Sequence, residues 1–221
     1  ILKAAGYRTL WYSNQDEVGL YDNMASCFAH ICDYYHFNTK KTRLDGDLIS
    51  LHKPSKGKEF IIYHLMGQHV DFSKRYPESF RFFKSSNYDK AKYTNQEVVA
   101  HYDNACLYND YVVSQLMNTY KNEDAIVIYF PDHGLDVFQT SSKYFGHAIN
   151  HKKESRKIGL QIPCFVYTSP RFKSSHKSLT EQIKNSVERK YCTAEMPFTL
   201  MHVAGYDFAQ HPTDTLYSLI K

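Results

Sequence analysis

The sequence contains no apolar segment long enough to form a membrane-spanning helix. Such a helix needs about 20 apolar residues, whereas the longest apolar runs here, 60–66 and 125–130, have the length of β-strands. A start methionine and a signal peptide are also absent. The opening Ile1-Leu-Lys-Ala-Ala-Gly6 is typical of the last turn of a helix that ends at a glycine, so we expect the chain to begin inside a domain.

Several common catalytic and binding motifs are missing as well. The absence of G-x-S-x-G, of a P-loop and of G-x-G-x-x-G argues against a serine hydrolase, a nucleotide kinase and a dinucleotide-dependent enzyme. The five cysteines form no C-x-x-C pair, which argues against a zinc knuckle, and Cys27 and Cys32 are compatible with a small disulfide loop or with two free thiols. The basic residues are scattered and form no basic helix, so we expect no nucleic-acid partner.

What the sequence does contain is the composition of one folded domain. Its 221 residues include 19 Tyr and 14 Phe, 43% are hydrophobic, and the formal net charge is +4. Such a chain can bury a core and is neither disordered nor fibrous. No repeat or low-complexity segment divides it, so we treat residues 1–221 as a single unit.

Short apolar runs alternate with helical periodicity, which predicts an α/β fold with a mainly parallel sheet flanked by helices. We expect four strands, at 9–13, 60–66, 125–130 and 162–168. Continuous apolar runs of this kind predict strands that are buried on both faces.

Three helices are expected to accompany these strands. The longest covers 94–120 and begins at Thr94-x-x-Glu97, which has the spacing of a capping box. Shorter helices are expected at 179–189 and 197–204. Apolar residues recur every three or four positions along the long helix, which predicts core packing and not a cofactor-binding face: Val98, Tyr102, Ala105, Val112, Leu116 and Tyr120.

The clearest candidate for chemistry lies where the strand 125–130 ends, at Asp132-His133-Gly134. Ligands of open α/β sheets bind at the carboxyl ends of the strands. An Asp oxygen and a His nitrogen both bind Zn²⁺ at ~2.0 to 2.2 Å, and a glycine would let the backbone turn sharply around the ion. The alternative is an ordinary turn that Asp132 caps beside an incidental histidine.

Two further histidines are expected at the same sheet edge. The strand 60–66 continues into Gly67-Gln-His69, which places His69 where it can touch a ligand, whereas His64 lies within the strand and is interpreted as a core or supporting residue. A later loop carries Gly146-His147 and can fold back over this edge. Together with His133, these histidines favour a metal or phosphate site, and the other histidines are interpreted as surface or core residues.

These motifs follow one another as they do in a known family. The motifs are His64-Leu-Met-Gly-Gln-His69, Lys74-Arg-Tyr-Pro77, Tyr102-Asp-Asn-Ala105, Asp132-His-Gly134 and Gly146-His147. With them in this order, and over nearly its whole length, the sequence resembles the sulfatase-like phosphoethanolamine transferases, which are membrane-anchored members of the alkaline phosphatase superfamily. Within that family, the segment 6–15 is more similar to the branch that modifies the lipopolysaccharide core than to the lipid A branch.

The resemblance implies an alkaline phosphatase/sulfatase-like fold with zinc at the carboxyl edge of the sheet. Asp132 and His133 would hold one Zn²⁺ together with an acidic residue and a nucleophilic Thr. His69 and His147 would contact the transferred phosphate or a second zinc. The Thr would take phosphoethanolamine from phosphatidylethanolamine and pass it to lipopolysaccharide or another envelope glycan.

The resemblance also implies that part of this machinery lies outside the chain. The acidic ligand, the Thr and the membrane helices are expected N-terminal to Ile1, so residues 1–221 would be the C-terminal part of a catalytic domain that faces the periplasm from the inner membrane. The motif departs from the family at Leu135, where Glu is usual, and at Pro131, where Ser is common. Asp136 is a possible substitute for that Glu. The alternatives are a sulfatase or phosphodiesterase of the same superfamily, and a metal-free interaction domain.

Overall fold

The computed structural model describes residues 1–19, 23–141, 143–147 and 152–206. Its largest sheet has three parallel strands in the order β2-β1-β3, where β1 is Arg8–Ser13, β2 is Tyr34–Phe37 and β3 is Glu59–His64. The strands expected at 9–13 and 60–66 are therefore present and pair as a parallel sheet. β2 was not anticipated, because its sequence Tyr-Tyr-His-Phe is too short to show a pattern.

Two smaller sheets complete the strand set. β4 (Ile126–Tyr129) and β7 (Phe165–Thr168) are the strands expected at 125–130 and 162–168, and they pair with each other in antiparallel fashion. β5 (Asp136–Val137) and β6 (Phe145–Gly146) form a short antiparallel pair. The expected parallel sheet is thus accompanied by an antiparallel pair, because the direction of pairing depends on contacts between distant segments that an apolar run does not encode.

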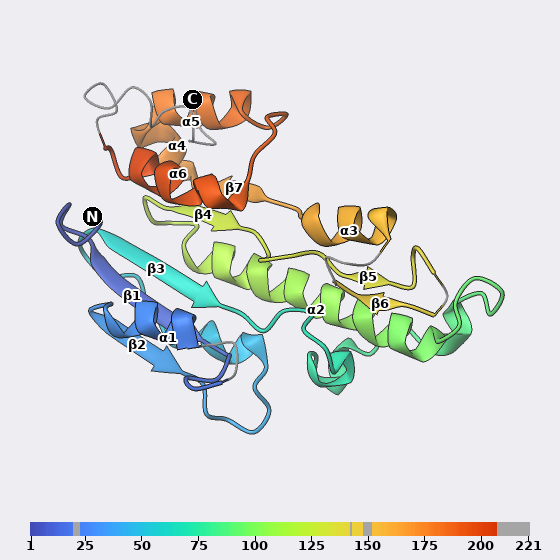
Figure 1. Ribbon diagram of the computed structural model, residues 1–221. Helices are drawn as coiled ribbons and strands as arrows, with labels where there is room; N and C mark the ends of the chain where they lie inside the picture. The colour runs from blue at the N-terminus through green and yellow to red at the C-terminus, as the bar shows by residue number, and fades with distance from the viewer. Residues whose placement is uncertain (20–22, 142, 148–151, 207–221) are drawn as a thin grey trace.

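The long helix α2 (Gln96–Thr119) lies between these two groups of strands (Figure 1). On one side Tyr63 and Leu65 pack against a core that includes Val112 and Leu116 of α2. On the other side, Asn109 of α2 donates a hydrogen bond to the hydroxyl of Tyr129 in β4, at 2.9 Å. The apolar stripe of this helix therefore serves the core, as its spacing predicted.

The boundaries of α2 correct one detail of the sequence analysis. The helix is capped by Asn95, whose side-chain oxygen accepts a hydrogen bond from the backbone N–H of Val98. Thr94 is therefore not the N-cap, and the expected capping box with Glu97 does not form. An Asn caps a helix as well as a Thr does, so the sequence offers two equivalent starting points one residue apart.

The remaining helices are short. α5 and α6 correspond to the helices expected at 179–189 and 197–204, and α4 to α6 gather beyond β4 and β7, in orange to red (Figure 1). No helix in the described part of the chain is long and apolar enough to cross a membrane. The helices and 3₁₀ turns are α1 (Asn23–His30), α3 (Lys153–Leu160), α4 (Pro170–Ser175), α5 (Lys177–Asn185), α6 (Met196–Val203), η1 (Asp45–Leu48), η2 (Phe72–Lys74), η3 (Glu78–Phe80), η4 (Ser85–Asn87) and η5 (Thr193–Glu195).

The strands differ in how deeply they are buried. β1 is buried from Thr9 to Ser13, because it has a neighbour on each edge, whereas β3 and β4 are half-buried along their whole length. The expectation that the apolar runs form strands buried on both faces is therefore wrong for β3 and β4 within this chain. Cys27 and Cys32 are free thiols.

Candidate functional site

The candidate residues follow the carboxyl ends of two strands. In Figure 1 the arrows of β3 and β4 point in the same direction, with α2 passing between them. The loop after β3 carries His69, and the loop after β4 carries Asp132 and His133. The fold therefore places both loops toward the same end of α2.

Asp132 and His133 present two metal-binding atoms to solvent. The Asp132 side chain is 87% exposed and that of His133 is 40% exposed, and Oδ2 of the first lies 3.6 Å from Nε2 of the second. Nδ1 of His133 lies 3.0 Å from the carbonyl oxygen of Gly134. Since a carbonyl only accepts hydrogen bonds, Nδ1 carries the proton, and Nε2 of the neutral ring keeps its lone pair.

This donor pair fits two corners of a zinc site. Two ligands at ~2.0 to 2.1 Å from one tetrahedral zinc ion lie about 3.3 Å apart, which is close to the separation of Asp132 Oδ2 and His133 Nε2. Among the residues that the structure describes, however, no group of three or more His, Cys, Asp or Glu side chains is arranged to hold a metal ion. The spacing of Asp132 and His133 is thus compatible with two of the four ligands of a zinc ion.

Gly134 is required by a close backbone contact. Its N–H donates to the carbonyl oxygen of Gly159 at 2.8 Å, and a Cβ at this position would lie 2.1 Å from the carbonyl oxygen of Ile158. The sharp turn expected at this glycine is not the reason for it, because its backbone does not adopt the left-handed conformation that would demand glycine. The loop after β4 instead lies directly against the end of α3, where a side chain has no room.

The same helix end brings His147 to His133. The backbone and Cβ of His147 lie 3.9 Å from where a Cβ on Gly159 would be, and the imidazole stacks on that of His133 with 4.0 Å between ring centroids. The expected return of the 146–147 loop to this edge is therefore observed. The contacts that achieve it, through Ile158 and Gly159 of α3, were not anticipated.

Asp136 has a different role from the one suggested for it. Its buried carboxylate accepts hydrogen bonds from the backbone N–H groups of Gln139 and Thr140, and also from the Thr140 hydroxyl. These contacts organise the 136–140 turn. Asp136 is thus engaged within its own loop, which does not favour the role of a substitute for the family's Glu.

The loop after β3 is built around a turn at residues 66–69. Gly67 has a φ of 55°, which glycine adopts without strain, and the N–H of His69 donates to the carbonyl oxygen of Met66 at 3.2 Å. The side chain of His69 is exposed. His64 lies inside the sheet, where Nδ1 is 3.1 Å from Oγ of Ser13, so it is a supporting residue as expected.

Sequence reasoning missed the residue that holds this turn. Asp45, in η1, is only 5% exposed, and its Oδ1 and Oδ2 accept the backbone N–H groups of Met66 and Gly67, each at 2.8 Å. Asn14, buried at the end of β1, donates to Oδ1 at 2.7 Å. Burial raises the pKa of Asp45, while these three hydrogen bonds oppose the rise. In the sequence Leu-Asp-Gly-Asp, nothing distinguishes Asp45 from an ordinary acidic residue in a surface turn.

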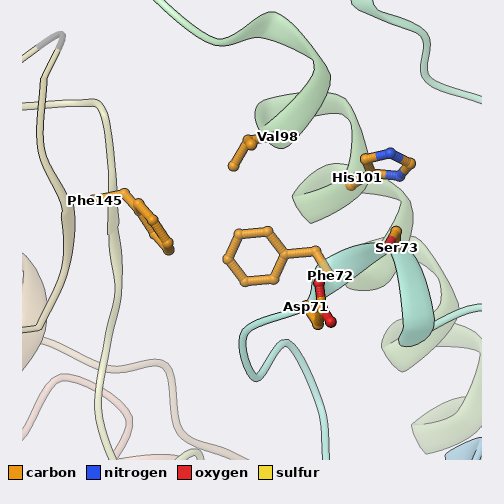
Figure 2. A pocket seen from close by; sticks show the side chains of 6 residues that line it. All are labelled: Asp71, Phe72, Ser73, Val98, His101 and Phe145. Atoms are coloured by element: carbon orange, nitrogen blue, oxygen red, sulfur yellow. The ribbon is translucent and has the colours of Figure 1, made fainter.

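A small hollow lies between η2, the start of α2 and β6 (Figure 2). It has a volume of about 140 Å³ and is lined by Asp71, Phe72, Ser73, Val98, His101 and Phe145. Asp71 follows His69 by two residues, and Phe145 precedes His147 by two. The Phe72 and Phe145 rings, 6.1 Å apart between centroids, give the hollow an apolar wall. Asp71, Phe72 and Phe145 therefore come together at this surface, while His69 and His147 are not part of its lining.

Comparison with known proteins places these observations in context. The sulfatase family model matches residues 1–206. The chain is 30% identical to phosphoethanolamine transferase EptC of Escherichia coli K12, 29% identical to phosphoethanolamine transferase CptA of Salmonella typhimurium, and 29% identical to the Kdo(2)-lipid A phosphoethanolamine 7''-transferase of E. coli K12. Each match covers 93 or 94% of this chain but only 38% of the relative.

Solved structures agree in fold. The crystal structure of the C-terminal periplasmic domain of EptC from E. coli superposes with a TM-score of 0.83 at 28% identity, covering 100% of this chain and 63% of that one. The zinc complex of the same domain gives a TM-score of 0.80 over 100% of this chain and 64% of that one, also at 28% identity. The alkaline phosphatase/sulfatase-like fold that the motifs implied is therefore confirmed.

Proposed function

We propose that this chain, which belongs to the sulfatase family, forms part of the catalytic domain of a zinc-dependent phosphoethanolamine transferase. The observation that carries the proposal is the arrangement of His133, whose Nδ1–H is held by the Gly134 carbonyl while Nε2 lies 3.6 Å from the exposed carboxylate of Asp132. The similarity to named phosphoethanolamine transferases supports the reaction class. Because the chain spans 38% of these relatives, the activity would belong to a longer protein.

In this proposal Asp132 and His133 hold the zinc ion, and the other ligands come from outside residues 1–221. The zinc complex of the similar EptC domain supports the choice of metal. When bound, the ion supplies positive charge that lowers the pKa of a nearby hydroxyl and stabilises charge developing on the phosphoryl oxygens. The Gly134 carbonyl keeps His133 in the tautomer that such binding needs.

The transfer would proceed by two displacements at phosphorus. A Thr oxygen forms a bond to the phosphorus of phosphatidylethanolamine, the bond to the diacylglycerol oxygen breaks, and that oxygen gains a proton. The oxygen of an acceptor hydroxyl would then form a bond to the phosphorus, the bond to the Thr oxygen would break, and the Thr oxygen would regain a proton as the acceptor loses one. His69 and His147 would hydrogen-bond the phosphoryl oxygens, on which negative charge grows in the transition state. Both side chains are exposed and thus open to a ligand.

The acceptor and the cellular location belong to the same proposal. A relative of this chain is named as acting on Kdo(2)-lipid A, which supports lipopolysaccharide or another envelope glycan as the acceptor. The similar solved domain is described as periplasmic, which supports a catalytic domain that faces the periplasm, with an inner-membrane anchor outside this chain. If water replaced the glycan, the enzyme would be a phosphodiesterase.

The nucleophile would also lie outside the chain, N-terminal to Ile1. The Thr140 hydroxyl follows the metal pair, but it donates to Asp136 and is committed to its own turn. Ser142 lies outside the described residues. We therefore expect residues 1–221 alone to bind zinc weakly and to form no phosphoethanolamine adduct.

Substitution of Asp132 in the intact protein tests the proposal. Asp132→Ala should lower zinc content and transfer together, because losing an anionic ligand leaves the ion under-coordinated. A matched control is Asp124→Ala, since Asp124 also pairs with a histidine, His176, at 3.1 Å but lies before β4. Zinc per protein would be measured by elemental analysis, and both modified acceptor and free phosphoethanolamine by mass spectrometry.

The possible results separate the alternatives. Zinc and transfer that fall in Asp132→Ala and persist in Asp124→Ala support the transferase. Unchanged zinc in Asp132→Ala would show that the metal assignment is wrong. Free phosphoethanolamine without modified acceptor would indicate a hydrolase, and a wild-type protein with neither zinc nor activity would indicate an interaction domain.

A further inference from the structure

We propose that Asp45 is a positioning residue, which fixes the turn at residues 66–69 and thereby sets the place of the His69 imidazole. The catalytic role of His69 rests on the proposed function. The contacts that hold the turn before His69 are observed in the structure. Asp45 is 20 residues or more from this turn in the sequence, so the contact is a product of the fold.

Both oxygens of the Asp45 carboxylate accept hydrogen bonds, from the turn and from Asn14. They accept three N–H groups, from Met66, Gly67 and Asn14, at 2.7 to 2.8 Å. A carboxylate offers only acceptors, so it can satisfy all three at once. An Asn in its place would turn one N–H₂ group toward backbone N–H donors, and at least one of them would lose its partner.

Arg75 holds the other end of the same segment. Its Nε donates to the carbonyl oxygen of His69 at 3.0 Å, and its Nη2 donates to the carbonyl oxygen of Val70 at 2.9 Å. A negative group thus binds the N–H groups where the turn begins, and a positive group binds the carbonyls where it ends. His69 lies between them, with its backbone held and its side chain exposed.

The support for Asp45 is itself fixed by buried contacts. The N–H of Gly46 donates to the hydroxyl of Tyr108 in α2 at 3.1 Å, and a Cβ on Gly46 would lie 2.3 Å from that oxygen. Asn14, which is fully buried, also donates to the carbonyl oxygen of Arg43 at 2.6 Å. Asp45 and its neighbour Gly46 therefore connect the end of β1 and α2 to the turn that carries His69.

Burying a carboxylate costs free energy unless hydrogen bonds in the protein replace those it made with water. Asp47, two residues later, shows the less costly alternative, because it contacts Lys40 and Thr42 at the surface. The partners of its carboxylate, Asn38, Lys40 and Thr42, all lie outside the 66–69 turn, so Asp47 provides a matched control on the same 3₁₀ turn. Of these two carboxylates, Asp45 is the one that accepts hydrogen bonds from the 66–69 turn.

The test is a mutant cycle in the intact protein, with phosphatidylethanolamine as donor. Asp45→Asn should lower kcat by about tenfold or more and change KM by less than about twofold, since a misplaced imidazole loses a transition-state contact. In a His69→Ala background, the same substitution should have no further effect on kcat. Asp47→Asn should leave kcat unchanged in both backgrounds. An equal loss of kcat with and without His69 would overturn the inference.

A second variant covers the case in which Asp45→Asn does not fold. Arg75→Gln changes a half-buried residue and removes the donors to the His69 and Val70 carbonyls. It should lower kcat by roughly threefold to tenfold, again only when His69 is present, and Arg75→Lys should not restore the rate because it lacks two parallel donors. A loss of kcat that persists without His69 would contradict the inference here as well.

Hydrogen exchange separates failure of this inference from failure of the proposed function. If the wild-type protein transfers no phosphoethanolamine, the proposed function fails while the placement of the turn can still be measured. Asp45→Asn should then increase amide exchange at Met66 and Gly67 by about tenfold, whereas Asp47→Asn should not. Unchanged protection of both amides in Asp45→Asn would show that Asp45 does not hold the turn.

Discussion

At the end of β3, the carboxylate of Asp45 and the guanidinium of Arg75 hold the turn before His69, whereas at the end of β4 the side chain of Asp132 is 87% exposed. The first loop is supported by buried groups from β1, η1 and α2. The second loop lies on the end of α3 through glycine contacts, and the Asp132 carboxylate and the His133 imidazole face solvent. The loop that carries His69 is thus held by buried groups of this chain, whereas Asp132 and His133 extend from their loop into solvent.

The largest effects should come from removing His69, in the loop after β3, and His147, which follows β6 and stacks on His133 of the loop after β4. In the intact enzyme, His69→Ala and His147→Ala should each lower transfer by about 10²-fold or more, because each removes a contact to the charge that develops on the phosphoryl group. Zinc held by Asp132 and His133 should remain. His176→Ala is the control, since His176 pairs with Asp124 before β4. Wild-type turnover in both variants would show that these histidines are structural.

A smaller effect is expected from breaking the contact between the β4 loop and α3. Gly134→Ala would place a methyl group 2.1 Å from the Ile158 carbonyl, so the loop or the helix must shift, at a cost of about 1 to 3 kcal/mol in the free energy of unfolding. Gly159→Ala is the control, because its Cβ meets only His147, at an ordinary 3.9 Å. Urea unfolding of both variants would measure the difference. Equal stability of the two would mean that the close contact is absent.

The smallest effect is expected at Asp33, away from both loops. Its carboxylate accepts hydrogen bonds from the backbone N–H and the hydroxyl of Thr9 and pairs with Lys3, and these contacts lower its pKa from 3.8 to about 2. A lowered pKa means that the stabilisation is present above about pH 4 and is lost as the pH falls through about 2. Asp33→Asn should therefore lower Tm slightly at neutral pH, and the difference should vanish near pH 2. A difference independent of pH would contradict this account.

The sequence predicted best those strands and helices that depend on residues close together in the chain. The apolar runs at 9–13, 60–66 and 125–130 and the long stripe at 94–120 correspond to β1, β3, β4 and α2, because strand and helix periodicities are local. The direction in which β4 pairs was not predictable from its own residues. It depends on β7, whose position follows from the whole segment between them.

The residues of the candidate site also differ in how well the sequence predicted them. Asp132, His133 and His147 were identified from glycine-bearing loops near strand ends, and the structure brings the rings of the two histidines together. Asp45 was not identified, because an acidic residue in a polar turn is ordinary until its burial is known. Its role depends on contacts with Met66, Gly67 and Asn14, which lie 20 or more residues away.

The end of α3 has a mechanical consequence. The carbonyl oxygen of Gly159 accepts the N–H of Gly134, and the backbone of His147 lies 3.9 Å from where a Cβ on Gly159 would be. The segments that carry His133 and His147 therefore share one support, the end of α3, whereas the turn before His69 is held by Asp45 and Arg75. The distance between His69 and the stacked pair thus depends on how α3 packs against the rest of the fold.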